Sequence, residues 1–144
     1  RKQFEENEFD LTFSNKRALE LMDMILFKPI EGVIMQEYMP KEDHFAIDIV
    51  AKTDEPVKSI ADGTVILSSW TEDSGYVIMI QHKNNLTSVY KHNAVILKKN
   101  GSFVEAGEII AIVGNSGEWT TGPHLHFEMW HNGEPINPLN YINY

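Results

Sequence analysis

The sequence predicts a mainly β protein, in which a compact antiparallel sheet or half-barrel follows a short N-terminal helix. From Pro29 onward, runs rich in Val, Ile, Tyr and Phe are separated by clusters of Gly, Asn and Asp, as in short strands joined by turns. Before Pro29, apolar residues recur with the period of a helix. The chain has 144 residues, enough for one domain with a hydrophobic core. We therefore expect a helical extension over residues 1–28 and a single β domain over residues 29–144.

The N-terminal helix is expected over residues 15–28, with the sequence NKRALELMDMILFK. Ser14 or Asn15 is placed to cap its first turn, and Pro29 should end it because proline interrupts helical hydrogen bonding. An apolar stripe at helical spacing is formed by Ala18, Leu21, Met22, Ile25 and Leu26. We expect this stripe to pack the helix against the β domain.

The β domain should consist of several short strands joined by tight turns. The strands are expected within residues 57–70, 75–82, 86–92, 102–114 and 124–130. Hairpin turns are expected at Asp62-Gly63, Asn84-Asn85 and Asn100-Gly101, because these residue types accept the left-handed backbone of a tight turn. Strands at this spacing favour a compact antiparallel sheet or barrel.

The composition excludes several classes of function. A formal net charge of −9 argues against binding to nucleic acid, because proteins that contact phosphate backbones carry a basic face. The absence of cysteine excludes disulfides, thiolate zinc sites and cysteine nucleophiles. No apolar run approaches the roughly 20 residues of a membrane-spanning helix, and the first residues do not form a signal peptide. We expect any membrane contact to need an anchor upstream of Arg1.

The segment GPHLHFEMW, residues 122–130, carries two histidines separated by one leucine. With the period of a strand, one face holds His124, His126, Glu128 and Trp130, and the other holds Leu125, Phe127 and Met129. A helix would point the two histidines about 200° apart, whereas a strand places them side by side, about 7 Å apart. We therefore predict a strand with its apolar face in the core. Glu128 either orients His126 through its free ring nitrogen or lies at the edge of a groove.

A second motif, HFAID, places His44 and Asp48 four residues apart. A fully extended strand would separate them by about 13 Å, too far for one metal ion. The segment must therefore bend between them, or Ala46 must lie at a bulge. Catalytic zinc takes three protein ligands from His, Asp and Glu and leaves a fourth position for water. His44, Asp48 and one histidine of the HLH pair meet that requirement, and the residues alone leave open which histidine it is.

The remaining imidazoles are candidates for proton transfer. A histidine beside a zinc ion, but not bound to it, can accept the proton of an attacking water or stabilise an oxyanion. Whichever histidine of the HLH pair does not bind the metal suits this role. His92 suits it too, in TSVYKHN, where Ser88, Tyr90 and His92 alternate onto one strand face.

Three ordered motifs carry a family resemblance: HFAIDI, VYKHN and TGPHLHFE. Together they resemble the signature of zinc metallopeptidases of the lysostaphin and LytM type, peptidase family M23, which are peptidoglycan endopeptidases on an antiparallel β scaffold. The resemblance extends to PVKSIADGTVI, to SGYVIMIQHKNNLTSVYKH, to GSFVEAGEIIAIVGNSGEWTTGPHLHFEMW and to the closing GEPINPLNYI. It covers about residues 29–142 and gives little help with the N-terminal segment.

The resemblance assigns roles to the site residues. It implies that His44, Asp48 and His126 bind Zn²⁺, and that His124 and His92 are the catalytic histidines near the scissile carbonyl. Some family members also use a tyrosine upstream of the HxxxD motif to stabilise the transition state, and Tyr38 is the candidate for that role. The main departure from the family is Ala46, where glycine is usual, because alanine would be strained at a positive φ.

Other residues receive simpler interpretations. The loop GNSGEWTTGP leads directly into the HLH strand, and we expect its Trp119 and Thr121 to contact substrate. His82, in a mostly apolar strand, is expected to be structural. His131, in the sequence HNGEP, is expected to be exposed at a turn.

The resemblance implies a zinc-dependent endopeptidase that hydrolyses the peptide cross-links of bacterial peptidoglycan through a zinc-activated water. Its partners would be peptidoglycan peptide stems. Its location would be the cell envelope, either periplasmic or extracellular, after export through a segment upstream of Arg1. The alternative is a catalytically silent module on the same fold that binds peptidoglycan or regulates another hydrolase. The complete set of ligand and histidine positions favours the enzyme, because silent family members typically lose one or more of them.

Overall fold

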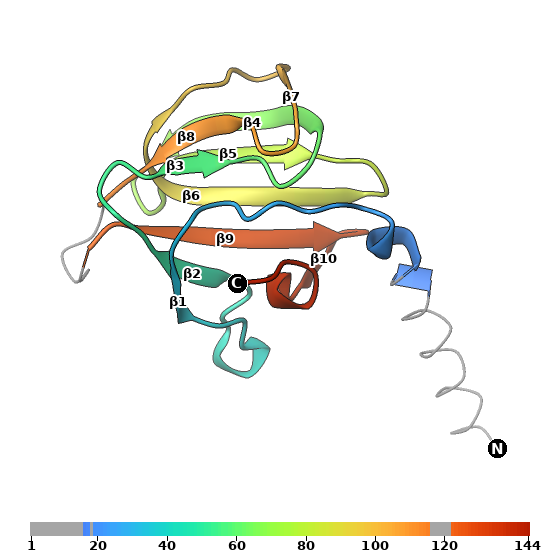
Figure 1. Ribbon diagram of the computed structural model, residues 1–144. Coiled ribbons are helices and arrows are strands. Elements are labelled where there is room, and N and C mark those ends of the chain that lie inside the picture. Colours follow the sequence, from blue (N-terminus) through green and yellow to red (C-terminus); the bar gives the residue numbers. More distant parts are fainter. Residues whose placement is uncertain (1–15, 18, 116–121) are drawn as a thin grey trace.

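One antiparallel sheet dominates the computed structural model, which describes residues 16, 17, 19–115 and 122–144 (Figure 1). Its strands are β1 (Val33–Gln36), β2 (Ile47–Val50), β3 (Pro56–Lys58), β4 (Gly63–Thr71), β5 (Gly75–Gln81), β6 (Leu86–Ile96), β7 (Phe103–Val104), β8 (Ile109–Val113), β9 (His124–His131) and β10 (Glu134–Ile136). The main order is β1-β2-β9-β6-β5-β4-β7. β10 pairs with β9, and β8 pairs with both β3 and β6. This architecture confirms the predicted fold class.

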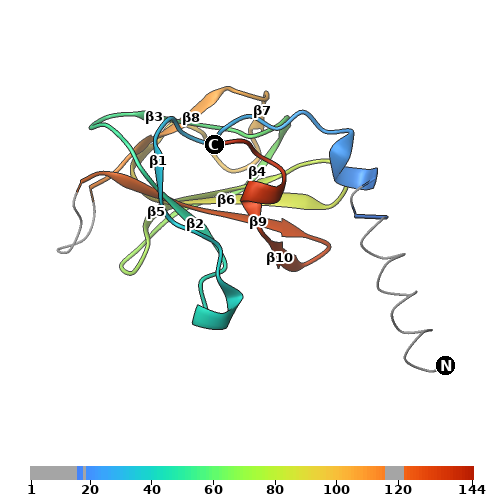
Figure 2. The same cartoon turned by 60° about the horizontal axis from the view of Figure 1, so that its bottom comes forward.

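β6 changes its pairing partner halfway along its length. Residues 86–91 pair with β9, whereas residues 93–96 pair with β8. The change occurs at His92, which therefore lies where the two ladders diverge. Figure 2 shows β3 and β8 on one side of the layer formed by β6 and β9. Two short 3-10 helices, η1 (Pro40–Glu42) and η2 (Pro138–Asn140), lie outside the sheet, and η1 stands away from it between β1 and β2.

The core lies against one face of the sheet. Leu125, Phe127 and Met129 of β9 are fully buried, which confirms the apolar face predicted for this strand. The ring of Tyr90 packs on Phe127 with 5.2 Å between centroids. The buried hydroxyl of Tyr90 accepts hydrogen bonds from the Ile60 amide and from a serine hydroxyl, so it has partners despite its burial. The opposite face of β9 is left for the polar row.

The N-terminal helix is shorter than predicted. Its described helical residues end at Met22, not just before Pro29. The Phe27 amide donates to the carbonyl of Ile60 at 2.8 Å, and the carbonyl of Pro29 accepts from the amide of Lys58 at 2.8 Å. These backbone partners, from the end of β3 and the loop after it, replace the hydrogen bonds that a longer helix would supply, so the chain leaves the helix early.

The predicted apolar stripe holds only in part. Leu21 is buried and Leu26 packs at the edge of the core, as predicted. Met22, the last helical residue, and Ile25, which lies beyond the helix, are instead 75% and 82% exposed. Ala18 lies outside the described residues. Within the described residues, no helix has the length and apolar character needed to span a bilayer.

A buried histidine anchors the N-terminal helix to the sheet. His131, the last residue of β9, is 1% exposed, so its predicted exposure is wrong. Its Nδ1 accepts a hydrogen bond from Arg17 Nε at 3.0 Å, and its Nε2 lies 3.0 Å from a carboxylate oxygen of Glu20. Arg17 also pairs with Glu134 at 2.7 Å. The helix therefore covers the end of β9 that the sequence pattern left open to solvent.

The three predicted hairpin turns have different outcomes. Asn84-Asn85 joins the paired strands β5 and β6 with left-handed φ angles of 62° and 56°, as predicted. Asp62-Gly63 is not a hairpin, because β3 before it pairs with β8 and β4 after it pairs with β5 and β7. Asn100-Gly101 is a turn, but the strands it joins, β6 and β7, do not pair with each other. Turn residues alone do not specify which strands pair.

Candidate metal centre

Adjacent strands bring the two predicted metal motifs together. Asp48 on β2 is the direct cross-strand partner of His126 on β9, and His44 lies just before β2. One ligand atom from each of these three residues lies within 4.8 Å of the other two. His44 Nε2 is 2.9 Å from Asp48 Oδ2, and His126 Nδ1 is 3.0 Å from Asp48 Oδ1. The carboxylate therefore lies between two imidazoles, close enough for all three to share one ion.

The HFAID segment bends as its spacing requires. β2 begins only at Ile47, whereas His44 forms an isolated bridge with Met39. Ala46, at the bend, is buried and is not among the described residues with positive φ. Alanine therefore replaces the glycine usual in the family without the backbone strain that a left-handed conformation would impose.

Hydrogen bonds select which nitrogen each ligand histidine can offer. His44 Nδ1 lies 2.7 Å from the carbonyl of Glu37, which accepts only from a protonated nitrogen, so Nε2, which faces Asp48, keeps the lone pair that can bind a metal. In His126 the roles are reversed, because Nε2 lies 2.8 Å from a carboxylate oxygen of Glu128 and Nδ1 faces Asp48. A partner on the outer nitrogen is the usual arrangement for a metal-binding histidine.

The centre stabilises positive charge. Burial alone would raise the pKa of Asp48, but hydrogen bonding and attraction from His126 and His44 lower it below its usual value. Burial would likewise lower the pKa of His126, but its hydrogen bonds to Asp48 and Glu128 raise it to about 9. Two imidazole nitrogens and a carboxylate oxygen, without thiolates, are the donor set of a three-ligand catalytic zinc site. The residues present therefore fit zinc.

Two further histidines lie beside these ligands. The rings of His92 and His124 are 5.3 Å apart between centroids, and the rings of His92 and His126 are 5.9 Å apart. His124 begins β9 and is mostly buried. Burial, together with the nearby charges of His124 and His126, lowers the pKa of His92 to about 4. The structure thus brings all four predicted site histidines and Asp48 into one cluster.

His92 reaches this cluster by breaking the strand alternation that the sequence predicted. Ser88 and Tyr90 are fully buried and hydrogen-bonded to each other on the core side, so strict alternation would bury His92 with them. Its φ of 69° is left-handed and interrupts that alternation. Such a conformation costs a non-glycine residue about 1–3 kcal/mol, so neighbours must enforce it.

Backbone contacts hold His92 in that conformation. Its amide donates to the carbonyl of Ser74 at 2.8 Å, and its carbonyl accepts from the amide of Gly114 at 2.9 Å. The side-chain amide of Asn93, which is buried, donates to the carbonyls of Tyr76 and Tyr90, each at 3.0 Å. Three separate segments therefore fix the backbone where β6 changes partners.

Replacing Gly114 with alanine should destabilise the protein and displace His92. A Cβ at position 114 would lie 2.5 Å from the carbonyl oxygen of His92 and 2.9 Å from the amide nitrogen of Ala94, and both contacts are with backbone. We expect the free energy of unfolding to fall by about 1–3 kcal/mol, as in other overpacked sites. Urea unfolding measures the loss. A variant as stable as the native chain would contradict this description of the β6–β8 junction.

The remaining predicted site residues have separate outcomes. The hydroxyl of Tyr38 donates to the carbonyl of Pro135 at 3.2 Å, and its ring meets Phe45 edge to face at 6.1 Å. A part for Tyr38 in the reaction stays a prediction. Trp119 and Thr121 lie outside the described residues. His82 is buried between the Asp62 carbonyl and a serine hydroxyl, which confirms its structural role.

A cluster around Glu128 includes Trp130, which the sequence analysis placed on the same strand face, and Lys91, which it did not name. Lys91 Nζ lies 3.0 Å from Glu128 Oε2, and Trp130 Nε1 donates to Glu128 Oε1 at 2.8 Å. Burial would raise the pKa of Glu128, but its bonds with His126, Trp130 and Lys91 lower it to about 2. Trp130 could have been found from the period of β9. Lys91 could not, because its place depends on the register between β6 and β9.

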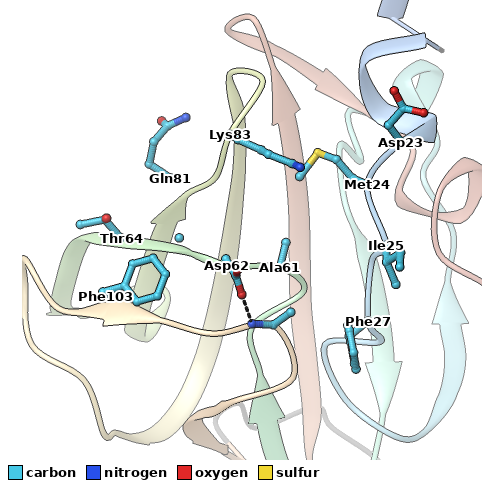
Figure 3. A pocket seen from close by; sticks show the side chains of 12 residues that line it. Asp23, Met24, Ile25, Phe27, Ala61, Asp62, Thr64, Gln81, Lys83 and Phe103 are labelled. Atoms are coloured by element: carbon cyan, nitrogen blue, oxygen red, sulfur yellow. Dashed lines mark hydrogen bonds between the residues drawn. The ribbon is translucent and has the colours of Figure 1, made fainter.

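Two of the hollows bordered by the described residues differ in their position relative to the metal centre. One, of about 500 Å³, lies over β4, β5, β6 and β9 and is bordered by Lys91, Glu128 and Trp130, beside the metal centre. The other, of about 640 Å³, is lined largely by apolar side chains such as Phe27 and Phe103 (Figure 3). The lining of this larger pocket includes neither Asp48 nor any of the four site histidines, so the pocket is separate from the candidate metal centre.

Comparison with known proteins finds relatives of this sequence. Over 96 residues the chain is 38% identical to the DD-carboxypeptidase/endopeptidase Mpg of Neisseria meningitidis, covering 67% of this chain and 22% of that protein. Over 86 residues it is 41% identical to the murein hydrolase activator EnvC of Escherichia coli, covering 60% of this chain and 20% of that protein. The matched stretches are thus about a fifth of each relative's length.

Solved structures share the fold. A zinc-containing peptidase from Vibrio cholerae superposes with a TM-score of 0.67 at 30% identity, over 78% of this chain and 37% of that one. Lysostaphin from Staphylococcus simulans superposes with a TM-score of 0.67 at 26% identity, over 76% of this chain and 48% of that one. The family model for peptidase family M23 matches residues 42–138, which include every predicted metal ligand and both further histidines. The chain belongs to peptidase family M23.

Proposed function

We propose that this protein is a zinc-dependent endopeptidase that hydrolyses peptide cross-links of bacterial peptidoglycan. The observation that carries the proposal is the convergence of His44, Asp48 and His126 on one point, with His92 and His124 beside them. A purely structural metal site has no need of the two additional imidazoles. The M23 family, and a relative whose name describes an endopeptidase, support peptide-bond hydrolysis.

In this proposal the metal would be held by His44 Nε2, the Asp48 carboxylate and His126 Nδ1. Zinc supplies Lewis-acid chemistry, since it makes water nucleophilic near neutral pH and polarises the carbonyl under attack. The name of the Vibrio cholerae structure describes a zinc-containing peptidase of the same fold, which supports this choice of metal. Three protein ligands leave room for water and substrate.

His92 and His124 would perform the proton transfers. One imidazole accepts the proton that the attacking water loses, and the other donates an N–H to the carbonyl oxygen as negative charge develops there. The Nδ1 of His124 lies 3.4 Å from the carbonyl of Gly122, so Nε2 is its atom for the substrate. The backbone contacts around His92 hold its main chain in place before the reaction, which reduces the entropy lost when its ring is aligned with the substrate.

The proposed substrates are the peptide stems of peptidoglycan, and the proposed location is the cell envelope. Support comes from the names of relatives, which describe a carboxypeptidase/endopeptidase and a murein hydrolase activator. The net charge of −9 is consistent with a protein that does not bind nucleic acid.

The test is digestion of purified cross-linked muropeptides by the zinc-loaded chain, followed by mass spectrometry. We expect cross-linked dimers to disappear and fragments to appear whose combined mass exceeds the dimer by one water per bond cut. The fragment masses identify the bond. Dimers that stay intact with a chain containing one zinc ion would overturn the proposal.

A second candidate function is regulation of another peptidoglycan hydrolase. The 41% identity to the activator EnvC favours it. An activator would stimulate its partner hydrolase without using the metal centre, so a His126→Ala variant should stimulate as well as the native chain. An endopeptidase should instead lose all activity with that substitution. Assaying both proteins with and without a second, added peptidoglycan hydrolase separates the two functions.

A further inference from the structure

Glu128 follows His126 by two residues on the same face of β9 and contacts its outer ring nitrogen. We propose that Glu128 is a positioning residue that fixes the tautomer and orientation of His126, and thereby the affinity of the centre for its metal. The inference rests on the metal site of the proposed function. It adds a residue that contacts neither the metal nor the substrate bond.

Glu128 acts first on the tautomer of His126. A neutral imidazole carries a proton on one nitrogen only, so His126 can offer Nδ1 to a metal only when the proton sits on Nε2. Glu128 Oε2 lies 2.8 Å from that nitrogen and, as a carboxylate, accepts but does not donate. The carboxylate of Glu128 therefore favours the tautomer in which Nδ1, which faces Asp48, is unprotonated and can bind a metal. His44 shows the mirror arrangement, with the Glu37 carbonyl at Nδ1 and with Nε2 facing Asp48.

The second step is rigidity. Glu128 is itself held from two sides, because Lys91 Nζ lies 3.0 Å from Oε2 and Trp130 Nε1 donates to Oε1 at 2.8 Å. Both carboxylate oxygens thus have partners, and the side chain is 12% exposed. An exposed ion pair would contribute little, whereas a shielded and fully bonded carboxylate keeps one orientation.

The third step is how the fold assembles this group. His126, Glu128 and Trp130 are successive residues on one face of β9, and Lys91 on β6 lies directly opposite His126 in the ladder. Lys91 also immediately precedes the left-handed residue His92. The cluster of Lys91, Glu128 and Trp130 therefore joins β9, which carries the metal ligand His126, to β6, which carries His92.

The test replaces Glu128 with alanine and measures zinc affinity by competition with a chelating dye. We expect the dissociation constant for zinc to rise about 10–100-fold, as for other partners of metal-binding histidines. Glu128→Gln keeps the shape and one acceptor oxygen without the charge, so its affinity should lie between alanine and the native chain. Glu134→Ala is the matched control, since Glu134 is an ion-paired carboxylate on the adjacent strand β10. Its zinc affinity should stay within twofold of native.

Two further readouts separate positioning from a general loss of structure. The metal-free Glu128→Gln protein should unfold in one cooperative thermal transition, at a midpoint somewhat below that of the native chain because the ion pair with Lys91 is lost. In the zinc-loaded native protein, ¹⁵N NMR should show His126 protonated at Nε2, and the Glu128→Ala spectrum should show loss of that single, slowly exchanging signal. If Glu128→Ala fails to fold, Glu128→Gln carries the test alone.

The experiment distinguishes a wrong role for Glu128 from a wrong proposed function. If the native chain binds zinc and cuts muropeptides but both Glu128 variants bind zinc within twofold of native, the positioning inference is wrong and the proposed function stands. If the native chain binds no zinc, both are overturned. If zinc affinity is unchanged and only KM rises, Glu128 contacts substrate in the adjacent groove and the inference is again wrong.

Discussion

Replacing Asp48 with alanine should abolish both zinc binding and peptidoglycan cleavage. Asp48 is the anion between the two ligand imidazoles, 2.9 Å from one and 3.0 Å from the other. Without it, two neutral nitrogens remain, one ligand short of the three that catalytic zinc requires. Metal analysis of the purified variant should find no bound zinc, whereas the native chain should hold about one ion per molecule.

Asp73→Ala is the matched control for this experiment, because Asp73 is an exposed aspartate in the turn between β4 and β5. It should bind zinc and cleave muropeptides like the native chain. Full zinc binding by Asp48→Ala would show that the metal is held elsewhere and would contradict the proposed ligand set.

Replacing His92 or His124 with alanine should reduce turnover while zinc binding persists. Both rings lie beside the ligand cluster, with 5.3 Å between their centroids, but neither belongs to the three-residue group that can hold an ion. Loss of a proton-transfer group typically costs a factor of about 10²–10⁴ in rate. We expect kcat on muropeptides to fall by that factor in each variant, with about one zinc per chain retained.

The double variant refines this prediction. Because the two imidazoles act in one transition state, their effects should not multiply, and the double variant should be little worse than either single variant. Unchanged kcat in both single variants would show that the histidines do not take part in the reaction. Loss of zinc from either variant would place that histidine among the ligands.

The parts of this structure that are local in sequence were predictable. The two faces of β9 follow from strand alternation alone, and Leu125, Phe127 and Met129 are buried as that alternation requires. The bend in HFAID follows from the distance that one metal ion can bridge. The pairing of Asp48 with His126 needed the family resemblance, since neither motif specifies its neighbouring strand.

The parts that depend on distant contacts were not predictable. His92 faces the site because β6 exchanges β9 for β8 at that residue, and no local pattern marks the exchange. The helix ends at Met22 because Phe27 finds a backbone partner at Ile60. His131 is buried because the helix covers it, which a turn-like sequence does not reveal. In each case a tertiary contact overrides the local preference.

The most direct test of the metal centre is a crystal structure of the zinc-loaded protein with anomalous diffraction at the zinc edge. We predict one peak, bonded by His44 Nε2, an Asp48 oxygen and His126 Nδ1 at about 2.0–2.2 Å. His92 and His124 should lie next to the ion without binding it. The proposed metal centre would be contradicted by a peak bonded by His92 or His124, by a bond through His126 Nε2, or by the absence of a peak between β2 and β9.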